Sequence, residues 1–362
     1  MTGWPPIAGQ PVVCKGEAMT DVGSSQAADT LSPAAHFDPT SAARDRRRSG
    51  GWRARERRLA GAVGSVALLP FAGFALVPVA YVLVISFTRY NGVRDPTWVG
   101  LHNYQLAFAD SSWWLSVVNT LVLAAGSIAI ELPLSLLLAV LLNRAVRWTS
   151  GFRTIFFLPH VISIAVMGVI FYFILRPING ILNGLLKGIG VISADVDWLG
   201  SGLTAMAALV LVSVWSGFGI NTIFFLVGLQ TIPRDVYESA SLDGASGWQQ
   251  FRTITLPLLT PILRIVVMLS IVFSLRSFDL VKTLTNGGPA GSTQVMFTYL
   301  FGYFFSLDRG SQYGYASALA VIASIVIAIV SLLYLALSRA NERRPASAGS
   351  RHGVRRRNGE SA

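Results

Sequence analysis

Long apolar segments alternate with short polar ones over most of the chain. Six of these segments are long enough to cross a membrane, because a helix needs about 20 mostly apolar residues to span roughly 30 Å of hydrocarbon. They cover residues 60–86, 116–142, 154–176, 203–229, 260–285 and 314–338. The pattern predicts an all-α, polytopic membrane protein with six transmembrane helices.

The composition supports this prediction and sets its limits. Of 362 residues, 52% are apolar and only 13% are charged, a balance that soluble domains do not need. The first 50 residues are rich in Ala, Ser, Asp, Thr and Pro and have too little apolar content to fold. We therefore expect a disordered basic tail over residues 1–58, a transmembrane domain over 59–340 and a second basic tail over 341–362.

Arginine marks one side of the predicted membrane domain. It gathers before the first span, between the second and third spans, and after the last: Arg44, Arg46, Arg47, Arg48, Arg53, Arg55, Arg57, Arg58; Arg144, Arg147, Arg153; Arg343, Arg344, Arg351, Arg355, Arg356, Arg357. The positive-inside rule then places both termini in the cytoplasm. Orientation and contact with anionic lipid account for the net charge of +11, so we expect no nucleic acid partner.

The chain lacks the residue patterns of common catalytic and metal sites. A phosphate-binding loop of the form GxxxxGK[ST] requires a glycine before its lysine, and Lys15, Lys187 and Lys282 all lack one. The four histidines are far apart and form no HExxH pair. We expect no catalytic residue, no metal site and no cofactor in this chain.

One polar segment, "IPRDVYESASLDGASGWQQFRTITLP" (residues 232–257), separates the fourth and fifth apolar segments. Pro233 suits the first turn of a short helix, and Gly244 can take the left-handed conformation that ends it. Ser246 and Gln249 have the spacing of a capping box that starts a second helix. The segment is predicted to be a compact, exposed pair of helices, after which Leu256–Pro257 turns the chain back into the membrane.

Two interpretations of this segment compete. Amphipathic helices that rest on lipid headgroups usually carry Lys or Arg on their polar face, whereas this segment begins with Asp235 and Glu238 and is rich in Ala, Ser and Gly. Small residues allow close approach by another protein, and an acidic helix complements a basic groove. Docking to a partner protein is therefore favoured.

The same segment resembles a known motif. It matches the EAA loop, EAA-x3-G-x9-I-x-LP, of permease subunits of ABC importers, with Ser239 in place of the first alanine; the matching residues are Glu238, Ala240, Gly244, Ile254, Leu256 and Pro257. In that family the loop lodges in a cleft of a separate subunit that hydrolyses ATP. The resemblance implies that Glu238, Ala240, Asp243 and Gly244 couple this chain to such a subunit, and that the chain itself is not an enzyme.

Further stretches resemble the carbohydrate-importer permeases of the maltose and glycerol-3-phosphate type. These are "WVGLHNY", "FRTIFFLPHVIS", "NGILNGLL", "LQTIPRDVYESASLDGAS" and "FDLVKTLTNGGP", which lie in this order between about residues 59 and 338. The resemblance implies the ABC importer permease fold and a location in a bacterial cytoplasmic membrane. It also implies three kinds of partner: a second permease subunit, two nucleotide-binding ATPase subunits that hold ATP and Mg²⁺, and an extracytoplasmic solute-binding protein.

Sugar is the expected solute, with alternatives. The same family includes importers of glycerol-3-phosphate. A secondary transporter is a further alternative, but it requires inverted repeats, and the two halves of this chain show no convincing similarity.

Two stripes of small and polar residues are candidates for the solute pathway. They recur every three to four residues in the fourth and fifth spans: Ser213, Ser216, Gly217 and Ile220; Ser270, Phe273, Ser274 and Ser277. Such stripes commonly serve close helix packing, yet sugars also bind through neutral hydrogen bonds beside an aromatic wall. Counted from the EAA loop, these positions are similar to those that line the sugar site of the maltose permease.

Charged residues inside the spans are costly and therefore informative, because a central Arg or Asp costs about 2.5–3.5 kcal/mol on insertion scales. Glu131 lies near the middle of the second span, and it could be protonated, bonded to a neighbouring helix or part of the pathway. Arg276, Asp279 and Lys282 are spaced three apart and are predicted to share one face of the fifth span. Mutual neutralisation and solute contact are both open for this triplet.

Overall fold

The computed structural model describes residues 70–144, 158–305 and 310–342, together with Leu68, Gly151 and Phe156. Contacts divide the chain into residues 1–70 and 71–362, and the fold below is that of the second unit. All of the first predicted tail, residues 1–58, and most of the second, residues 341–362, lie outside the described residues. The domain boundaries at 58 and 340 therefore remain predictions.

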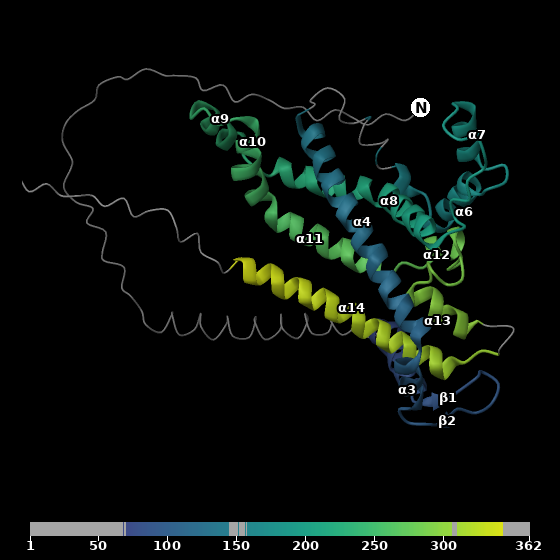
Figure 1. The fold of residues 1–362 in the computed structure, drawn as a ribbon. Coiled ribbons are helices and arrows are strands. Elements are labelled where there is room, and N and C mark those ends of the chain that lie inside the picture. Colours follow the sequence, from purple (N-terminus) through teal and green to yellow (C-terminus); the bar gives the residue numbers. More distant parts are fainter. Residues whose placement is uncertain are drawn as a thin grey trace, which may run out of the picture. The chain divides into compact units, whose positions relative to one another are not determined.

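Helices make up nearly all of the described fold (Figure 1). In chain order the elements are η1 (Ala72–Leu76, π-helical), α2 (Val77–Ile85), β1 (Thr88–Arg89), β2 (Thr97–Trp98), α3 (His102–Ala109), α4 (Ser111–Arg144), α6 (Ile164–Leu175), α7 (Ile181–Gly188), α8 (Gly202–Gln230), α9 (Arg234–Leu242), α10 (Gly247–Gln250), η2 (Phe251–Thr255, π-helical), α11 (Leu256–Leu275), α12 (Asp279–Leu284), α13 (Met296–Phe304) and α14 (Tyr313–Glu342).

All six predicted spans contain an apolar helix. Among the described residues, four helices are long and apolar enough to cross a membrane: Ser111–Asn143, Gly202–Gln230, Gly247–Leu275 and Tyr313–Ala340. The other two are shorter, at Ala72–Ile85 and Ile164–Leu175. The first of these continues a predicted span whose residues 60–67 lie outside the described part. The all-α, multi-pass prediction is confirmed.

The third predicted span, residues 154–176, is not one continuous helix. Residues 158–161 are helical, Ile162 is not, and α6 begins only at Ile164. Ser163 has an extended backbone with ψ of 132°, and its carbonyl accepts the N–H of Met167. A separate helix therefore starts at this serine, and the predicted uninterrupted span was wrong.

The fifth predicted span is shifted towards the preceding polar segment. Its helix begins at Gly247 and ends at Leu275, rather than covering residues 260–285. Pro257 does not turn the chain, because the π-helical turn η2 precedes it and pairs the N–H of Leu256 with the carbonyl of Phe251. The wider turn relieves the clash that a proline ring makes with the carbonyl four residues earlier.

A break after Leu275 also separates the predicted charged triplet. Arg276 caps α11, whereas Asp279 and Lys282 belong to the short helix α12. Phe278 contacts Phe301 of α13, with 5.0 Å between ring centroids, so this packing draws the chain away from the helical path. The prediction that the three charges share one helical face was wrong.

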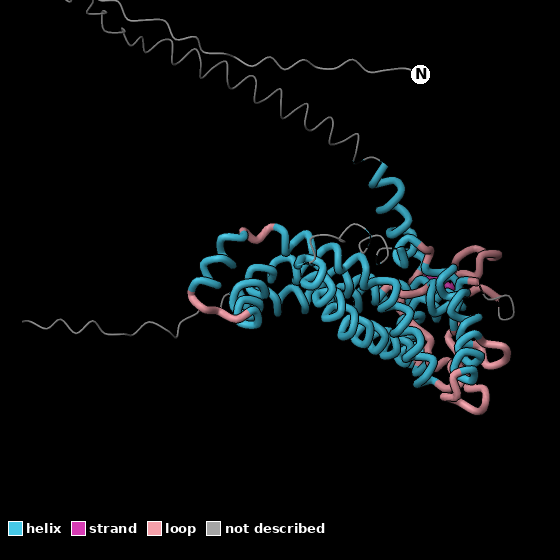
Figure 2. Tube along the Cα trace, turned by 90° about the horizontal axis from the view of Figure 1, so that it is seen from above, coloured by secondary structure: helices cyan, strands magenta, loops and turns pink. Residues whose placement is uncertain are grey.

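Helix α4 runs through the whole described core. Near its start Trp113 packs with α13 and α14, in its middle Leu123 packs with α6, α8 and α12, and near its end Ala139 packs with α8 and α11. The loops lie mainly at the two ends of the long helices (Figure 2). A two-stranded antiparallel ribbon at one end pairs Thr88 with Trp98, a feature that the sequence pattern did not predict.

Candidate functional site

The segment 232–257 forms the predicted pair of short helices, α9 and α10. Gly244 has φ of +77° and ends α9. The N–H of Ala245 bonds to the carbonyl of Ala240 at 2.9 Å, and the N–H of Gly244 bonds to that of Ser241 at 3.1 Å. These two bonds form a Schellman motif, which satisfies carbonyls at the helix end. The predicted role of Gly244 in ending the first helix is confirmed.

The second helix starts with the predicted capping box. The side chain of Ser246 accepts the N–H of Gln249 at 3.4 Å, while Gln249 Oε1 accepts the N–H of Ser246 at 2.7 Å. Trp248 and Phe251 stack with 5.5 Å between ring centroids. Their indole and phenyl rings form an apolar face, on which Trp248 is 69% exposed.

Hydrogen bonds join the two short helices to each other and to the start of the fifth span. Gln250 Nε2 donates to Ser241 Oγ and to the carbonyl of Ala245, both at 3.0 Å. The hydroxyls of Tyr237 and Thr255 are 2.9 Å apart. We name residues 232–257 the coupling segment. It is held as one ordered unit, and α10, η2 and α11 continue from it as a single helix to Leu275.

The predicted coupling residues lie on the open side of this unit. Glu238, Asp243 and Gly244 are exposed, and Ala240 is half-buried. A Cβ added to Gly244 would meet no atom within 4 Å. Beneath the helices is a hollow, lined by Val140, Asn143, Leu229, Tyr237, Gly247, Gln250, Phe251 and Thr255. An exposed, rigid unit with acidic residues and little bulk is suited to protein contact.

A polar cluster lies in the middle of the long helices. Asn221 Nδ2 on α8 donates to Glu131 Oε1 on α4 at 2.5 Å, and to Ser270 Oγ on α11 at 3.1 Å. Glu131 is only 7% exposed and Ser270 only 6%. One amide thus connects three helices in a region where interhelical hydrogen bonds replace water.

Gly217 makes room for this cluster. A Cβ at Gly217 would overlap the Glu131 carboxylate, so the absence of a side chain lets the carboxylate pack against α8. Within the described residues, an ion pair joins Lys187 to Asp195 at 2.7 Å, and none involves Glu131. Of the alternatives for Glu131, bonding to a neighbouring helix is what the structure shows.

The remaining pathway candidates are distributed unevenly. Ser216 Oγ bonds within its own helix to the carbonyl of Ser213 at 3.0 Å, and Ile220 is half-buried. Ser274 Oγ is 3.4 Å from Ser127 Oγ on α4. Phe273 is 76% exposed, and Ser277 is half-buried just after the end of α11. The structure therefore brings together Glu131, Gly217 and Ser270, while Phe273 is largely exposed.

Asn221 escaped the sequence analysis, although a signal for it was present. The fourth-span stripe steps from Gly217 to Ile220, but a step of four residues reaches Asn221, on the same helical face. An amide inside a hydrocarbon-spanning helix is costly without a partner. That cost alone marks Asn221 for attention.

The sequence analysis also missed a second polar cluster, which lies at the start of α4. Asp110 Oδ1 accepts the N–H groups of Ser112 and Trp113, at 3.0 and 3.3 Å, and so caps α4. Its Oδ2 accepts the hydroxyls of Tyr299 and Tyr315, at 2.5 and 2.9 Å. Burial raises the pKa of Asp110, but these four hydrogen bonds together outweigh it and leave the pKa below its usual value.

The charged triplet after α11 contains no ion pair within the described residues. Lys282 Nζ donates to Asn286 Oδ1 at 2.7 Å and lies 5.2 Å from the ring centroid of Phe301. Mutual neutralisation, one of the two alternatives for the triplet, is therefore not what the structure shows.

Comparison with known proteins identifies a family and several relatives that match more than half of the chain. Residues 131–346 match the family described as binding-protein-dependent transport system inner membrane component. The chain is 34% identical over 273 residues to a probable ABC transporter permease protein of Bacillus subtilis, covering 75% of this chain and 92% of the relative.

Two other relatives have names that include their solutes. The trehalose/maltose transport system permease protein of Thermococcus litoralis is 32% identical over 74% of this chain and 88% of its own length. The multiple sugar-binding transport system permease protein of Streptococcus mutans is 34% identical over 70% of this chain and 86% of its own length.

A solved structure shares the fold. It is a bacterial ABC transporter involved in the import of the acidic polysaccharide alginate, and one of its chains superposes with a TM-score of 0.69 at 24% identity. The match covers 80% of this chain and 98% of that one. A second structure of an alginate transporter, in complex with a periplasmic protein bound to alginate pentasaccharide, gives the same TM-score at 23% identity.

Proposed function

Because the chain belongs to the family of binding-protein-dependent transport system inner membrane components, we propose that it is the permease subunit of an ATP-driven carbohydrate importer. Relatives named for trehalose, maltose and multiple sugars support a sugar as the solute. The chain is a multi-pass membrane protein of the ABC importer permease fold. It forms half of the pathway, and a second permease subunit forms the other half.

ATP hydrolysis takes place on separate subunits, and this chain binds no cofactor. The arginine pattern supports an orientation with both termini and the coupling segment in the cytoplasm. Two nucleotide-binding subunits then hold ATP and Mg²⁺ on that side. A solute-binding protein delivers sugar on the other side, as the complex formed by the related alginate transporter suggests.

The observation that carries this proposal is the exposed, hydrogen-bonded coupling segment. Its two short helices are fixed to each other by Gln250 and to η2 by the Tyr237–Thr255 contact. A movement imposed on α10 therefore passes directly into α11, which is the same continuous helix. We assign the contact with the ATPase subunit to Glu238, Ala240, Asp243 and Gly244.

The movement reaches the middle of the membrane through α11. Ser270 lies on this helix and accepts a hydrogen bond from Asn221, which also binds Glu131. Motion of α11 is thereby shared with α8 and α4. An ATP-driven change at the coupling segment shifts the equilibrium between inward-open and outward-open states, because the ATPase subunit binds the two states with different affinity.

Reconstitution tests this proposal. The chain is purified with the proteins encoded beside it, and the solute-binding protein is screened by thermal shift against disaccharides, sugar alcohols and glycerol phosphates. Proteoliposomes containing the assembly should take up the sugar so identified only when ATP is present. Uptake without ATP, or purification without an ATPase subunit, would show that the proposal is wrong.

A further inference from the structure

The short helix α7 and the residues that flank it carry exposed apolar side chains. Ile181 and Leu185 lie on α7, while Ile178 precedes it and Ile189 and Val191 follow it; their exposed fractions are between 57% and 75%. We call these five residues the stripe of α7. Gly184 and Gly188 lie between them, and a Cβ added to either would meet no atom within 4 Å. The stripe is aliphatic along its length. We propose that α7 is an interfacial membrane anchor whose aliphatic stripe lies in the lipid at the outer edge of the bilayer.

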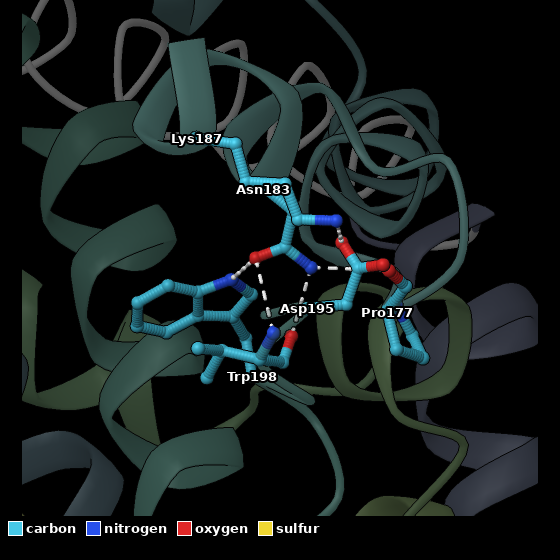
Figure 3. Close-up of polar contacts among 6 residues, drawn as sticks. Pro177, Asn183, Lys187, Asp195 and Trp198 are labelled. Atoms are coloured by element: carbon cyan, nitrogen blue, oxygen red, sulfur yellow. Dashed lines mark hydrogen bonds and ion pairs between the residues drawn. The ribbon is translucent and has the colours of Figure 1, made fainter. Parts of the chain in front are cut away.

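The inner side of α7 is fixed, so the stripe is held outwards. Asn183 is 1% exposed and uses its whole amide: Nδ2 donates to the carbonyls of Pro177 and Val196, and Oδ1 accepts from Val196 N and Trp198 Nε1 (Figure 3). Lys187 Nζ and Asp195 Oδ1 form an ion pair at 2.7 Å beside it. These contacts fasten α7 to the loop of residues 195–198.

The position of α7 limits what its stripe can meet. Helix α6 ends at Leu175 and α7 begins at Ile181, and a link of five residues reaches at most about 18 Å when fully extended. The actual link is tighter, since a Cβ at Gly180 would overlap the carbonyl of Arg176. Helix α7 therefore starts beside the end of an apolar membrane helix, at the depth of the headgroups.

The stripe comes directly after α6 in the chain, and α6 exposes an apolar face that is suited to contact with lipid. Val166, Val169, Ile170 and Phe173 are exposed on α6 at the spacing of one helical face. Arg176 lies 5.1 Å from the ring centroid of Phe173, so its charge sits where the apolar face of α6 ends. A cation and an aromatic ring at this level are typical of the membrane–water boundary.

Side-chain chemistry favours lipid over a protein partner. The strongest contacts in protein interfaces come from Trp, Tyr and Arg, whereas Leu and Val are under-represented. The stripe of α7 consists of Ile, Leu and Val with two glycines, and it contains no polar group. Aliphatic side chains without hydrogen-bonding groups suit acyl chains. This inference depends on the membrane location of the chain and goes beyond its proposed role in sugar transport.

Spin-label accessibility tests the inference. The complete importer, with Cys14→Ser and Leu185→Cys, is labelled with a nitroxide and placed in nanodiscs of phosphatidylethanolamine and phosphatidylglycerol. Collision rates are then measured with oxygen, which concentrates in lipid, and with a water-soluble nickel chelate. Oxygen should dominate at Leu185→Cys, and again at Ile189→Cys, which serves as a second reporter on the same stripe.

A matched control separates the outcomes. Val93 is 90% exposed in the β1–β2 turn, beside Arg94 and Asp95, so a label at Val93→Cys should collide mainly with the nickel chelate. Dominance of the nickel chelate at both stripe positions would overturn the inference in favour of water. A label that neither reagent reaches would overturn it in favour of a protein partner.

Discussion

The amide of Asn221 donates to the carboxylate of Glu131 across the interface between α8 and α4, with 2.5 Å between nitrogen and oxygen. The same amide donates to Ser270 on α11 at 3.1 Å. Three of the long helices are therefore joined at one point, and the third of them continues into the coupling segment. This connection gives Asn221, a polar residue in a mostly apolar helix, two hydrogen-bond partners on neighbouring helices.

Loss of this amide should destabilise the protein. Asn221→Leu leaves Glu131 and Ser270 without their partner, and an unsatisfied buried polar group costs about 1–3 kcal/mol. We expect a lower melting temperature in detergent, measured by intrinsic fluorescence. Ser324→Ala is the control, because the Ser324 hydroxyl bonds only within its own helix, to Ala320. Equal melting temperatures for the two variants would contradict the role of Asn221.

A side chain at Gly217 should clash with Glu131. We expect Gly217→Ala to lower stability by about 1–3 kcal/mol, which is typical of overpacking. Adding Glu131→Ala to the same chain removes the overlap and should recover part of this loss in a double-mutant cycle. Gly184→Ala, at an open helical position, should leave the melting temperature unchanged or raised. An interaction free energy of zero in this cycle would mean that Gly217 and Glu131 do not interact.

Protonation of Asp110 should make the stability of the folded protein fall at acid pH. The pKa of Asp110 in the folded protein lies below its usual value. The carboxylate therefore contributes its full stabilisation above the unfolded-state pKa of about 3.9. This stabilisation is lost as pH falls through the folded-state pKa. Asp110→Asn should therefore lower the melting temperature at pH 7 and show a smaller further loss between pH 5 and pH 3. Tyr299→Phe, which removes one hydroxyl donor, should move the wild-type loss to higher pH. Parallel pH profiles for all three proteins would refute this.

Coupling should depend on the backbone at Gly244. Its φ of +77° is unfavourable for other residues, by roughly 1 kcal/mol or more, although the space around it is open. Gly244→Asp also adds a charge to the docking surface, so ATP-driven uptake should fall at least tenfold while the amount of protein in the membrane is unchanged. Gly188→Ala, at an open position remote from the coupling segment in sequence, should transport normally.

Charge at Glu238 should matter for the same contact. The side chain is exposed and forms no hydrogen bond among the described residues, so its loss has little effect on folding. Glu238→Lys should abolish uptake by reversing the charge that faces the ATPase subunit, whereas Arg94→Glu, a charge reversal at an exposed residue of the β1–β2 turn, should leave uptake normal. Normal uptake by Glu238→Lys would remove Glu238 from the interface.

Local signals explain what the sequence could predict. The capping box at Ser246 and the glycine at Gly244 act through neighbouring residues only, so the two short helices of the coupling segment were predicted, although the turn at Pro257 was not formed. The six apolar segments were found for the same reason, because hydrophobicity is a property of each segment alone.

Features set by distant contacts could not be predicted. The break after Leu275 depends on Phe278 packing against α13, and the helix through Pro257 depends on a π-helical turn. The stripe from Ser213 to Ile220 has the right period, but periodicity does not say which neighbouring helix each side chain meets. The pairing of Glu131 with Asn221, 90 residues apart, is of this kind.

Photo-crosslinking at the coupling segment tests the central claim most directly. A benzophenone amino acid replaces Ser239, an exposed residue next to Glu238, and the assembly is irradiated in membranes while ATP-driven uptake is measured in parallel. The account predicts an adduct with the ATPase subunit, and none with that subunit when the label replaces Val93 in the β1–β2 turn. Full uptake with no ATPase adduct at Ser239 would contradict it.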